Sequence, residues 1–264
     1  MSRRRFHAPP AAFSPDGARV SLSREEAQHL TGVLRLGAGE EVYVFDGEGR
    51  EFLCVVTEDA RRVAARSATL DVRAAVEPQC PESPLELTLC VALLKGEKFD
   101  LVVQKATELG VARVVPVETA RADVKLRRGR RDAGALNRVE RWRRIAVEAA
   151  KQSGRARVPE VTGPSSLTDL LTQGSAGGTG AKGRRLIFSE RGGRSLVETV
   201  GAWGERPGRV AALVGPEGGW EDAEIEEATS SGWEAVTLGG RVMRAETAGV
   251  VVAALLQHLC GDLR

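Results

Sequence analysis

Two glycine-rich stretches in the second half of the chain combine residue types that can bind and transform a ligand. They run from Leu213 to Trp220 and from Leu238 to Ala248. Each follows a short apolar run and precedes a helical pattern, which predicts a strand, a tight turn and a helix. Glycine lets the backbone approach a ligand and adopt positive φ at little cost. Both turns are therefore expected at the carboxyl edge of one parallel sheet, where open α/β sheets bind ligands.

The polar residues in these stretches suit a reaction in which a proton or a charge moves. Glu246 and Glu217 can accept a proton, and Arg244 is a fixed cation that can steady an anion. The competing interpretation of Glu246 is a helix cap or a partner of Arg244. Thr247 is expected to cap the helix or contact a ligand. The glycines themselves could also be ordinary loop residues, although two such turns with these side chains favour a binding site.

The elements that must position these residues begin at Leu85, where strands start to alternate with helices. This alternation predicts an α/β fold with a mostly parallel sheet. Helices are expected around Phe99 and Trp142, and near Glu221 and Thr247. Strands are expected at 85–94, 111–117, 184–188, 210–214 and 235–238.

The first 76 residues have a different, β-rich pattern. Strands are expected at 20–22, 41–45 and 51–56, with a hairpin turn between the last two. A short helix should begin after Ser23, in a pattern that resembles a capping box, and continue through Leu34. The sequence predicts a small barrel at 1–76, a proline-rich linker at 77–84 and an α/β domain at 85–264. The glycine-rich stretch 174–183 is expected to be a loop.

Composition narrows the class of protein. The 264 residues carry a net charge of only +2, but arginines cluster at 3–5, 127–131 and 138–144, as a nucleic-acid-binding face would require. Coding bias is the competing explanation of these clusters. The four cysteines form no CxxC pair and the three histidines are scattered, so no metal site and a cytoplasmic protein are expected. The longest apolar stretch, 248–256, is too short to span a bilayer.

The sequence lacks the motifs of several common enzyme classes. The chain contains no P-loop and no Gly-x-Ser-x-Gly nucleophile elbow. Its first α/β strand runs into Leu94–Lys98 without a glycine fingerprint, which disfavours a Rossmann dinucleotide or methyltransferase site. An α/β enzyme that uses NAD or ATP remains a disfavoured alternative.

Several segments taken together resemble one known family. The segments are Arg4–Phe6, His29–Arg35, Lys95, Lys105–Val111, Glu148–Arg155, Gly215–Gly219 and Leu238–Ala248. They are similar to the small-subunit (16S) ribosomal RNA uridine-N3 methyltransferases (RsmE-like) of the SPOUT superfamily. The resemblance covers nearly the whole chain. Trp220 departs from it, standing where Phe or Leu is more usual, and the 174–183 stretch looks like an insertion.

This resemblance implies a PUA-like RNA-binding β-barrel followed by a trefoil-knotted α/β domain with helices on both faces of its sheet. It implies S-adenosyl-L-methionine as cofactor and a homodimer. The expected cofactor-binding residues are Leu213, Val214, Gly215, Pro216, Glu217, Gly218, Leu238, Gly239, Val242, Met243, Arg244, Ala245 and Thr247.

The implied reaction is methylation of N3 of a uridine in 16S rRNA, presented as RNA or within the assembled 30S subunit. Arg244 and Glu246 are the expected catalytic residues, with Glu217 as the substitute proton acceptor. A non-catalytic RNA-binding ribosome assembly factor on the same fold is the alternative. The expected RNA-binding residues are Arg4, Arg5, His29, Arg35, Arg121 and Arg155.

Overall fold

The computed structural model describes residues 3–58, 68–122, 133–172 and 183–264. The chain divides into two compact units. Unit 1 comprises residues 1–82 and 147–158, and unit 2 comprises residues 83–146 and 159–264. Unit 1 therefore takes in a segment, 147–158, that lies far from the predicted barrel in sequence. The predicted limits of 1–76, 77–84 and 85–264 stay a prediction.

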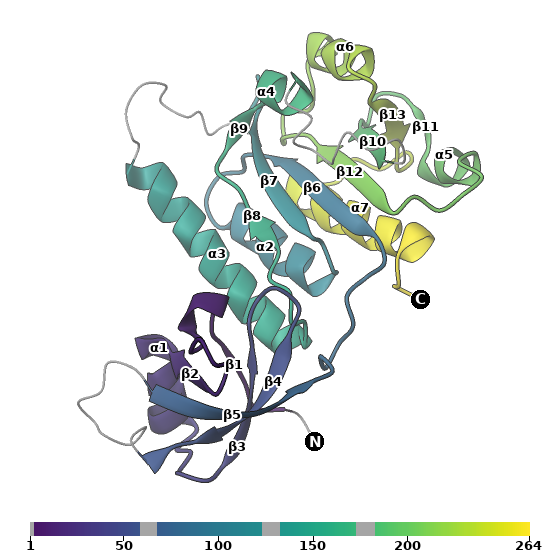
Figure 1. Cartoon of the computed structure of the whole chain (residues 1–264). Helices are drawn as coiled ribbons and strands as arrows, with labels where there is room; N and C mark the ends of the chain where they lie inside the picture. The colour runs from purple at the N-terminus through teal and green to yellow at the C-terminus, as the bar shows by residue number, and fades with distance from the viewer. Residues whose placement is uncertain (1–2, 59–67, 123–132, 173–182) are drawn as a thin grey trace. The chain divides into compact units, whose positions relative to one another are not determined.

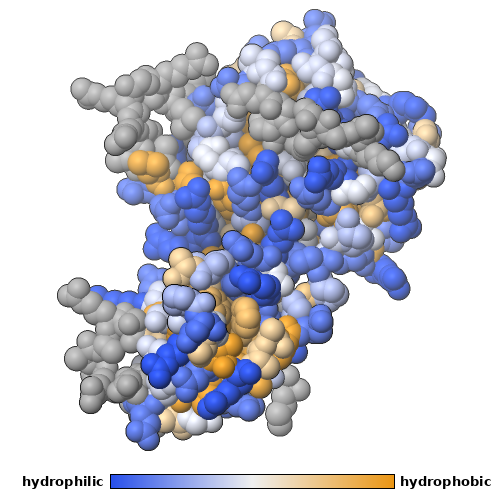
Figure 2. Space-filling view, viewed as in Figure 1, coloured by the Kyte–Doolittle hydropathy of each residue, from blue (hydrophilic) through white to orange (hydrophobic). Residues whose placement is uncertain are grey.

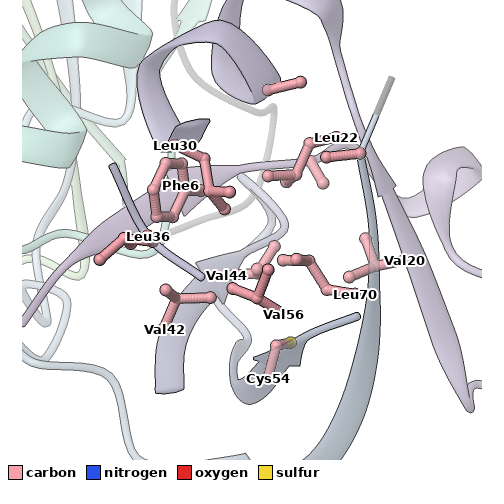
Figure 3. Close-up of a cluster of buried hydrophobic side chains, with 13 residues drawn as sticks. Phe6, Val20, Leu22, Leu30, Leu36, Val42, Val44, Cys54, Val56 and Leu70 are labelled. Carbon is pink, nitrogen blue, oxygen red and sulfur yellow. The ribbon is translucent and has the colours of Figure 1, made fainter. Parts of the chain in front are cut away.

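Unit 1 is a curled sheet of five strands in the order β1-β3-β4-β5-β2. Its one parallel pair is β1–β3, and the expected hairpin joins β3 to β4. Phe6, Leu30, Val44 and Leu70 are fully buried inside the curl (Figure 3). The strands are β1 Arg5–His7, β2 Arg19–Leu22, β3 Glu41–Phe45, β4 Glu51–Val56 and β5 Ala68–Val76.

The helix of unit 1 is shorter than expected. After a 3₁₀ turn, η1 (Pro10–Ala12), α1 covers only Arg24–Gln28, and a π-helical turn, η2 (His29–Val33), follows. Ser23 accepts a hydrogen bond from the Glu26 backbone at 3.3 Å, which is half of the expected capping box. The Glu26 carboxylate instead pairs with Lys151 at 2.6 Å.

Unit 2 is built on a parallel sheet in the order β11-β13-β10-β12-β6-β7-β8, with β9 also paired to β7. The five strands predicted for this part of the chain are all present, as β6, β7, β10, β12 and β13. The strands are β6 Glu86–Ala92, β7 Arg113–Glu118, β8 Glu160–Val161, β9 Ser165–Ser166, β10 Gly183–Phe188, β11 Arg194–Ser195, β12 Arg209–Val214 and β13 Glu234–Thr237. This confirms the predicted α/β class.

Helices cover both faces of this sheet (Figure 1). On one face α7 contacts α2, β6 and β12. On the other, Leu170 of α4 and Ala228 of α6 share a core with Leu213 of β12. The helices are α2 Lys98–Glu108, α3 Ala133–Ser153, α4 Leu167–Thr172, α5 Leu196–Gly201, α6 Asp222–Ser230 and α7 Ala245–Cys260. The predicted 174–183 loop lies outside the described residues except for Gly183, which begins β10.

The connection from β13 to α7 brings distant parts of the chain together. β13 pairs with β10 on the side away from β12, yet α7 contacts β12 and β6. Residues 238–244 must therefore cross the carboxyl ends of β10 and β12 to reach the start of α7. This crossing carries the second glycine-rich turn to the first.

Candidate active site

Both glycine-rich turns line one cavity of about 250 Å³. The first turn follows β12 and the second follows β13, and both strands run parallel to β10. The structure thus confirms that the two turns meet at the carboxyl edge of the sheet. The predicted residues that line the cavity are Val214, Gly215, Pro216, Glu217, Gly218, Leu238, Gly239, Val242, Met243 and Ala245.

Three predicted cofactor-binding residues, Leu213, Arg244 and Thr247, do not line this cavity, and neither does the predicted catalytic residue Glu246. Leu213 is fully buried in the core cluster beneath α4 and α6, because its side chain alternates to the opposite face of the sheet from Val214. Arg244 and Thr247 are exposed at the start of α7. Arg244 occupies the N-cap position of α7 and makes no side-chain capping hydrogen bond.

The end of β10 supplies a third wall that the sequence reasoning missed. Phe188, Ser189 and Glu190 line the cavity, together with Gly219 and Trp220 from the first turn. The signal was present, since Arg191-Gly192-Gly193 follows this strand as glycines follow the other two. Thr237, Arg241 and Ala248 complete the lining.

Trp220 fixes the first turn to the end of β10. Its indole nitrogen donates a hydrogen bond of 2.8 Å to the carbonyl oxygen of Phe188. The indole also lies against Gly215, where an added Cβ would come within 2.9 Å of the ring. Close packing therefore requires glycine at position 215. Trp220, which departs from the family pattern, holds this turn against the end of β10.

Lys98, at the start of α2, reaches the first turn. Its ammonium group donates a 2.7 Å hydrogen bond to the Glu217 carboxylate. This bond raises the pKa of Lys98, with further contributions from the charges of Glu217 and Glu246 and an opposing one from Arg244. Partial burial alone would raise the pKa of Glu217, but the Lys98 hydrogen bond and backbone hydrogen bonding outweigh it and the pKa is lowered. Lys98 therefore holds the carboxylate of a residue that lines the cavity.

Glu246 is buried, with 8% of its surface exposed. Its Oε2 atom has no hydrogen-bond partner in the part of the chain that the structure describes. Glu246 lies within the first turn of α7 rather than at its N-cap, which is Arg244. A buried carboxylate oxygen without a partner is costly unless a ligand or a proton completes its surroundings. Three roles were predicted for Glu246: proton acceptor, helix cap and partner of Arg244. The helix-cap role is wrong, because Arg244 holds the N-cap position.

Two of the six predicted RNA-binding residues, Arg5 and Arg155, are instead paired with carboxylates inside unit 1. Arg5 is buried, pairs with the buried Glu51 at 2.9 Å and donates to the carbonyl oxygens of Ala150 and Arg155. The spacing of Glu148, Gln152 and Arg155 predicts one shared polar helix face, but Arg155 lies beyond the end of α3. It is 3% exposed and pairs with Glu82 at 2.6 Å. The prediction that these two side chains bind RNA is wrong for this structure, because their charges are already neutralised inside unit 1.

The other four candidates are accessible. Arg4 is exposed and pairs with Glu40 at 2.9 Å, and His29 is half-buried beside the ring of Phe6. Arg35 is exposed with a φ of 55°, a left-handed conformation that is uncommon for a residue other than glycine. In unit 2, Arg121 is exposed and donates a 3.2 Å hydrogen bond to the carbonyl oxygen of Gly218, beside the cavity.

Hydrophilic residues predominate on the visible face, interrupted by small hydrophobic patches (Figure 2). Among the described residues, His, Cys, Asp and Glu side chains form no group of three or more that could hold a metal ion. Within the same residue ranges, no helix has both the length and the apolar character needed to cross a bilayer.

Comparison with known proteins gives consistent matches over nearly the whole chain. An RNA methyltransferase domain matches residues 81–257, and an RNA methyltransferase PUA domain matches residues 22–66. Ribosomal RNA small subunit methyltransferase E of Mycobacterium bovis is 34% identical, over 90% of this chain and 86% of its own. The protein of the same name from Synechocystis is 31% identical, over 92% of this chain and 74% of its own.

A solved structure extends the match to three dimensions. It is a ribosomal RNA small subunit methyltransferase E from Neisseria gonorrhoeae bound to S-adenosyl methionine. It is 31% identical with a TM-score of 0.83, and the match covers 100% of both chains.

Proposed function

Since this chain belongs to the RNA methyltransferase family, we propose that it transfers a methyl group from S-adenosyl-L-methionine to N3 of a uridine in 16S rRNA. One observation carries this proposal. The two glycine-rich turns lie at the same sheet edge and enclose one cavity, with the walls described above. The neighbouring structure that contains S-adenosyl methionine has the same fold over its full length.

The residues present fit such a donor. The bound donor supplies an electrophilic methyl group on a sulfonium centre, so the site needs no metal. Gly215 and Gly239 present only backbone atoms to the cavity. Val242 and Met243 offer apolar contacts. The buried Oε2 atom of Glu246 has no hydrogen-bond partner among the described residues, which leaves it open to a ligand group or a proton.

The protein must also hold the uridine in line and remove its N3 proton. We assign proton acceptance to Glu246, whose free oxygen can take a proton, with Glu217 as the substitute. Glu217 is held by Lys98 and stays ionised, which makes it the weaker base. Arg244 can steady the anionic base. Alignment can supply roughly 7–11 kcal/mol, and a placed base about 10²–10⁴ in rate, so positioning is the larger contribution.

RNA contacts are assigned to Arg4, His29 and Arg35 of unit 1 and to Arg121 of unit 2. Arg121 is bonded to the first turn itself, so an RNA phosphate held by it would lie beside the donor. The three arginines predict that log K falls with log salt at a slope of about −2 to −3. The partner is 16S rRNA or the assembled 30S subunit, in the cytoplasm.

Two further properties belong to this proposal. We propose that residues 238–244, which cross the ends of β10 and β12, form part of a trefoil knot. A homodimer is proposed through α7, where Val251, Ala254 and Leu255 remain half-buried on an apolar helix. Light scattering of the purified chain measures its oligomeric state.

The decisive experiment combines donor binding with methyl transfer. Calorimetry should show that the chain binds S-adenosyl-L-methionine, and the purified protein should methylate 16S rRNA or 30S subunits from cells that lack it. Glu246→Gln should bind the donor but lose at least about 10²-fold in rate. The exposed Glu226→Gln on α6 is the matched control. Donor binding without any methyl transfer would favour the RNA-binding assembly factor, and no donor binding would overturn the proposal.

A further inference from the structure

The cavity contains a second carboxylate that the proposed reaction does not use. Glu190 follows β10 and lines the cavity together with Glu217. Its Oε1 atom lies 2.7 Å from the point that a Cβ on Gly219 would occupy. The carboxylate of Glu190 therefore rests on the bare backbone of the first turn, and a side chain at position 219 would displace it.

The two cavity carboxylates differ in how far they are neutralised. Glu217 is paired with the Lys98 ammonium group at 2.7 Å. For Glu190, the nearest cation in the described part of the chain is Arg191, whose Nε is 3.7 Å away. The Arg191 guanidinium also donates to the carbonyl oxygen of Trp220 and pairs with Asp222 at 3.1 Å. Glu190 thus keeps a negative charge that a cation in the cavity can pair with.

The remaining charged residue of the lining is Arg241, in the second turn. It is exposed and comes from a different strand end than Glu190. The cavity therefore offers an anionic group on the β10 side and a cationic group in the second turn. A ligand with both charges, such as an amino acid derivative that also carries a sulfonium, matches this combination.

We infer that Glu190 makes the cavity prefer the cationic methyl donor over its neutral product, an inference that rests on the proposed function. In the reaction the S–CH₃ bond breaks, its electron pair stays on sulfur, and the methyl group bonds to N3. The N3 proton passes to a carboxylate of the protein. At sulfur the ligand changes from a cationic sulfonium to an uncharged thioether, so the attraction between the sulfur centre and Glu190 is lost. Glu190 thereby assists the exchange of spent product for fresh donor.

Calorimetry of the full chain tests this with S-adenosyl-L-methionine and S-adenosyl-L-homocysteine as the two probes. Glu190→Gln keeps the shape and hydrogen-bonding capacity of the side chain but removes its charge. The ratio of the product Kd to the donor Kd should fall by about fivefold, which is the size expected for a half-exposed ion pair. The product Kd itself should stay within about twofold. Glu205→Gln, an exposed change of equal charge away from the cavity, should leave the ratio unchanged.

Two results would overturn the inference while leaving the proposed function intact. If Glu190→Gln weakens both ligands equally, the charge of Glu190 acts on a group that both ligands share, such as the α-ammonium group or the ribose hydroxyls, and not on the sulfonium. If neither Kd changes, Glu190 does not contact the ligand. A wild-type chain that binds neither ligand would instead overturn the proposed function. Thermal unfolding of each variant, expected to match wild type, separates these results from misfolding.

Discussion

The indole nitrogen of Trp220 is hydrogen-bonded to the carbonyl oxygen of Phe188 at 2.8 Å, although 32 positions separate them in the chain. Trp220 belongs to the turn after β12, and Phe188 is the last residue of β10. Both residues are buried. This one bond therefore joins two of the three strand ends that form the cavity.

Loss of this bond should destabilise unit 2. Trp220→Phe keeps an aromatic ring but leaves the Phe188 carbonyl without its donor. The matched control is Trp233→Phe, because Trp233 is equally buried and its indole nitrogen has no partner among the described residues. Trp220→Phe should cost about 1–3 kcal/mol more in the free energy of unfolding than Trp233→Phe. Equal losses in chemical denaturation would show that ring volume, and not the hydrogen bond, is what matters.

Neighbouring glycines after β10 should respond very differently to alanine. Gly193 has a φ of 116°, and a Cβ there would lie 2.7 Å from the carbonyl oxygen of Ala235. Gly192 has nothing within 4 Å of its Cβ position. Gly193→Ala should lower the free energy of unfolding by roughly 1–3 kcal/mol from backbone strain, with the clash adding to it. Gly192→Ala should stay within about 0.5 kcal/mol, and a comparable loss there would contradict this account.

Substitutions of the adjacent residues Arg4 and Arg5 should have opposite effects: one should lower the stability of unit 1, and the other should weaken RNA binding. Arg5→Met removes the buried cation that pairs with Glu51, which keeps only Arg3 at 3.1 Å and the Gln79 backbone nitrogen at 2.9 Å, and it should cost up to about 3–5 kcal/mol in the stability of unit 1. Arg4 is exposed and pairs with a half-exposed Glu40, so Arg4→Met should change stability by no more than about 0.5 kcal/mol. Calorimetric unfolding measures both. Filter binding to 16S rRNA should show weaker binding for Arg4→Met, and an unchanged affinity would remove Arg4 from the proposed RNA surface.

The ion pair at the first turn has a predictable pH dependence. Glu217 has a lowered pKa, so its contribution to stability is present above its usual value of 4.5 and is lost as the pH falls through the folded pKa. Lys98 has a raised pKa, so its contribution is present below 10.5 and is lost as the pH rises through the folded pKa. Lys98→Met should therefore raise the pKa of Glu217, observed as a shift of its carboxyl carbon titration by NMR.

Lys105→Met is the control for this titration. Lys105 lies on the same helix and forms a similar exposed pair with Glu108, but it does not reach the cavity. Its loss should leave the Glu217 titration unchanged. If Lys98→Met also leaves it unchanged, the hydrogen bond from Lys98 is not the cause of the lowered pKa.

The sequence was sufficient to predict the parallel sheet of unit 2 and to predict that the two glycine-rich turns lie at the same edge of it. Short apolar runs ending in glycine mark β12 and β13, and because both strands are parallel, Gly215 and Gly239 had to appear at the same edge. The third wall at Glu190 was missed because only the pairing of β13 with β10, a long-range contact, shows that this strand end lies between the other two.

The arginines show why the role of each charged side chain could not be predicted from the sequence. Arg4 and Arg5 are neighbours with the same chemistry, and only strand alternation and the distant Glu51 decide which one is buried. Arg155 appeared to continue the face of a helix, but α3 ends at Ser153 and Gly154, with a φ of 85°, turns the chain. The role of Lys98 depends on a partner 119 positions away. Such tertiary pairings leave no local signal.

The route of residues 238–244 sets the order in which this protein can become active. The wall formed by the second turn takes its place only when β13 has paired with β10 and α7 has packed against β12, so the cavity with its three walls requires the chain through α7. Maturation of the pocket is thus a late event in folding. A nascent chain on the ribosome would be unable to capture the methyl donor until nearly all of unit 2 had emerged.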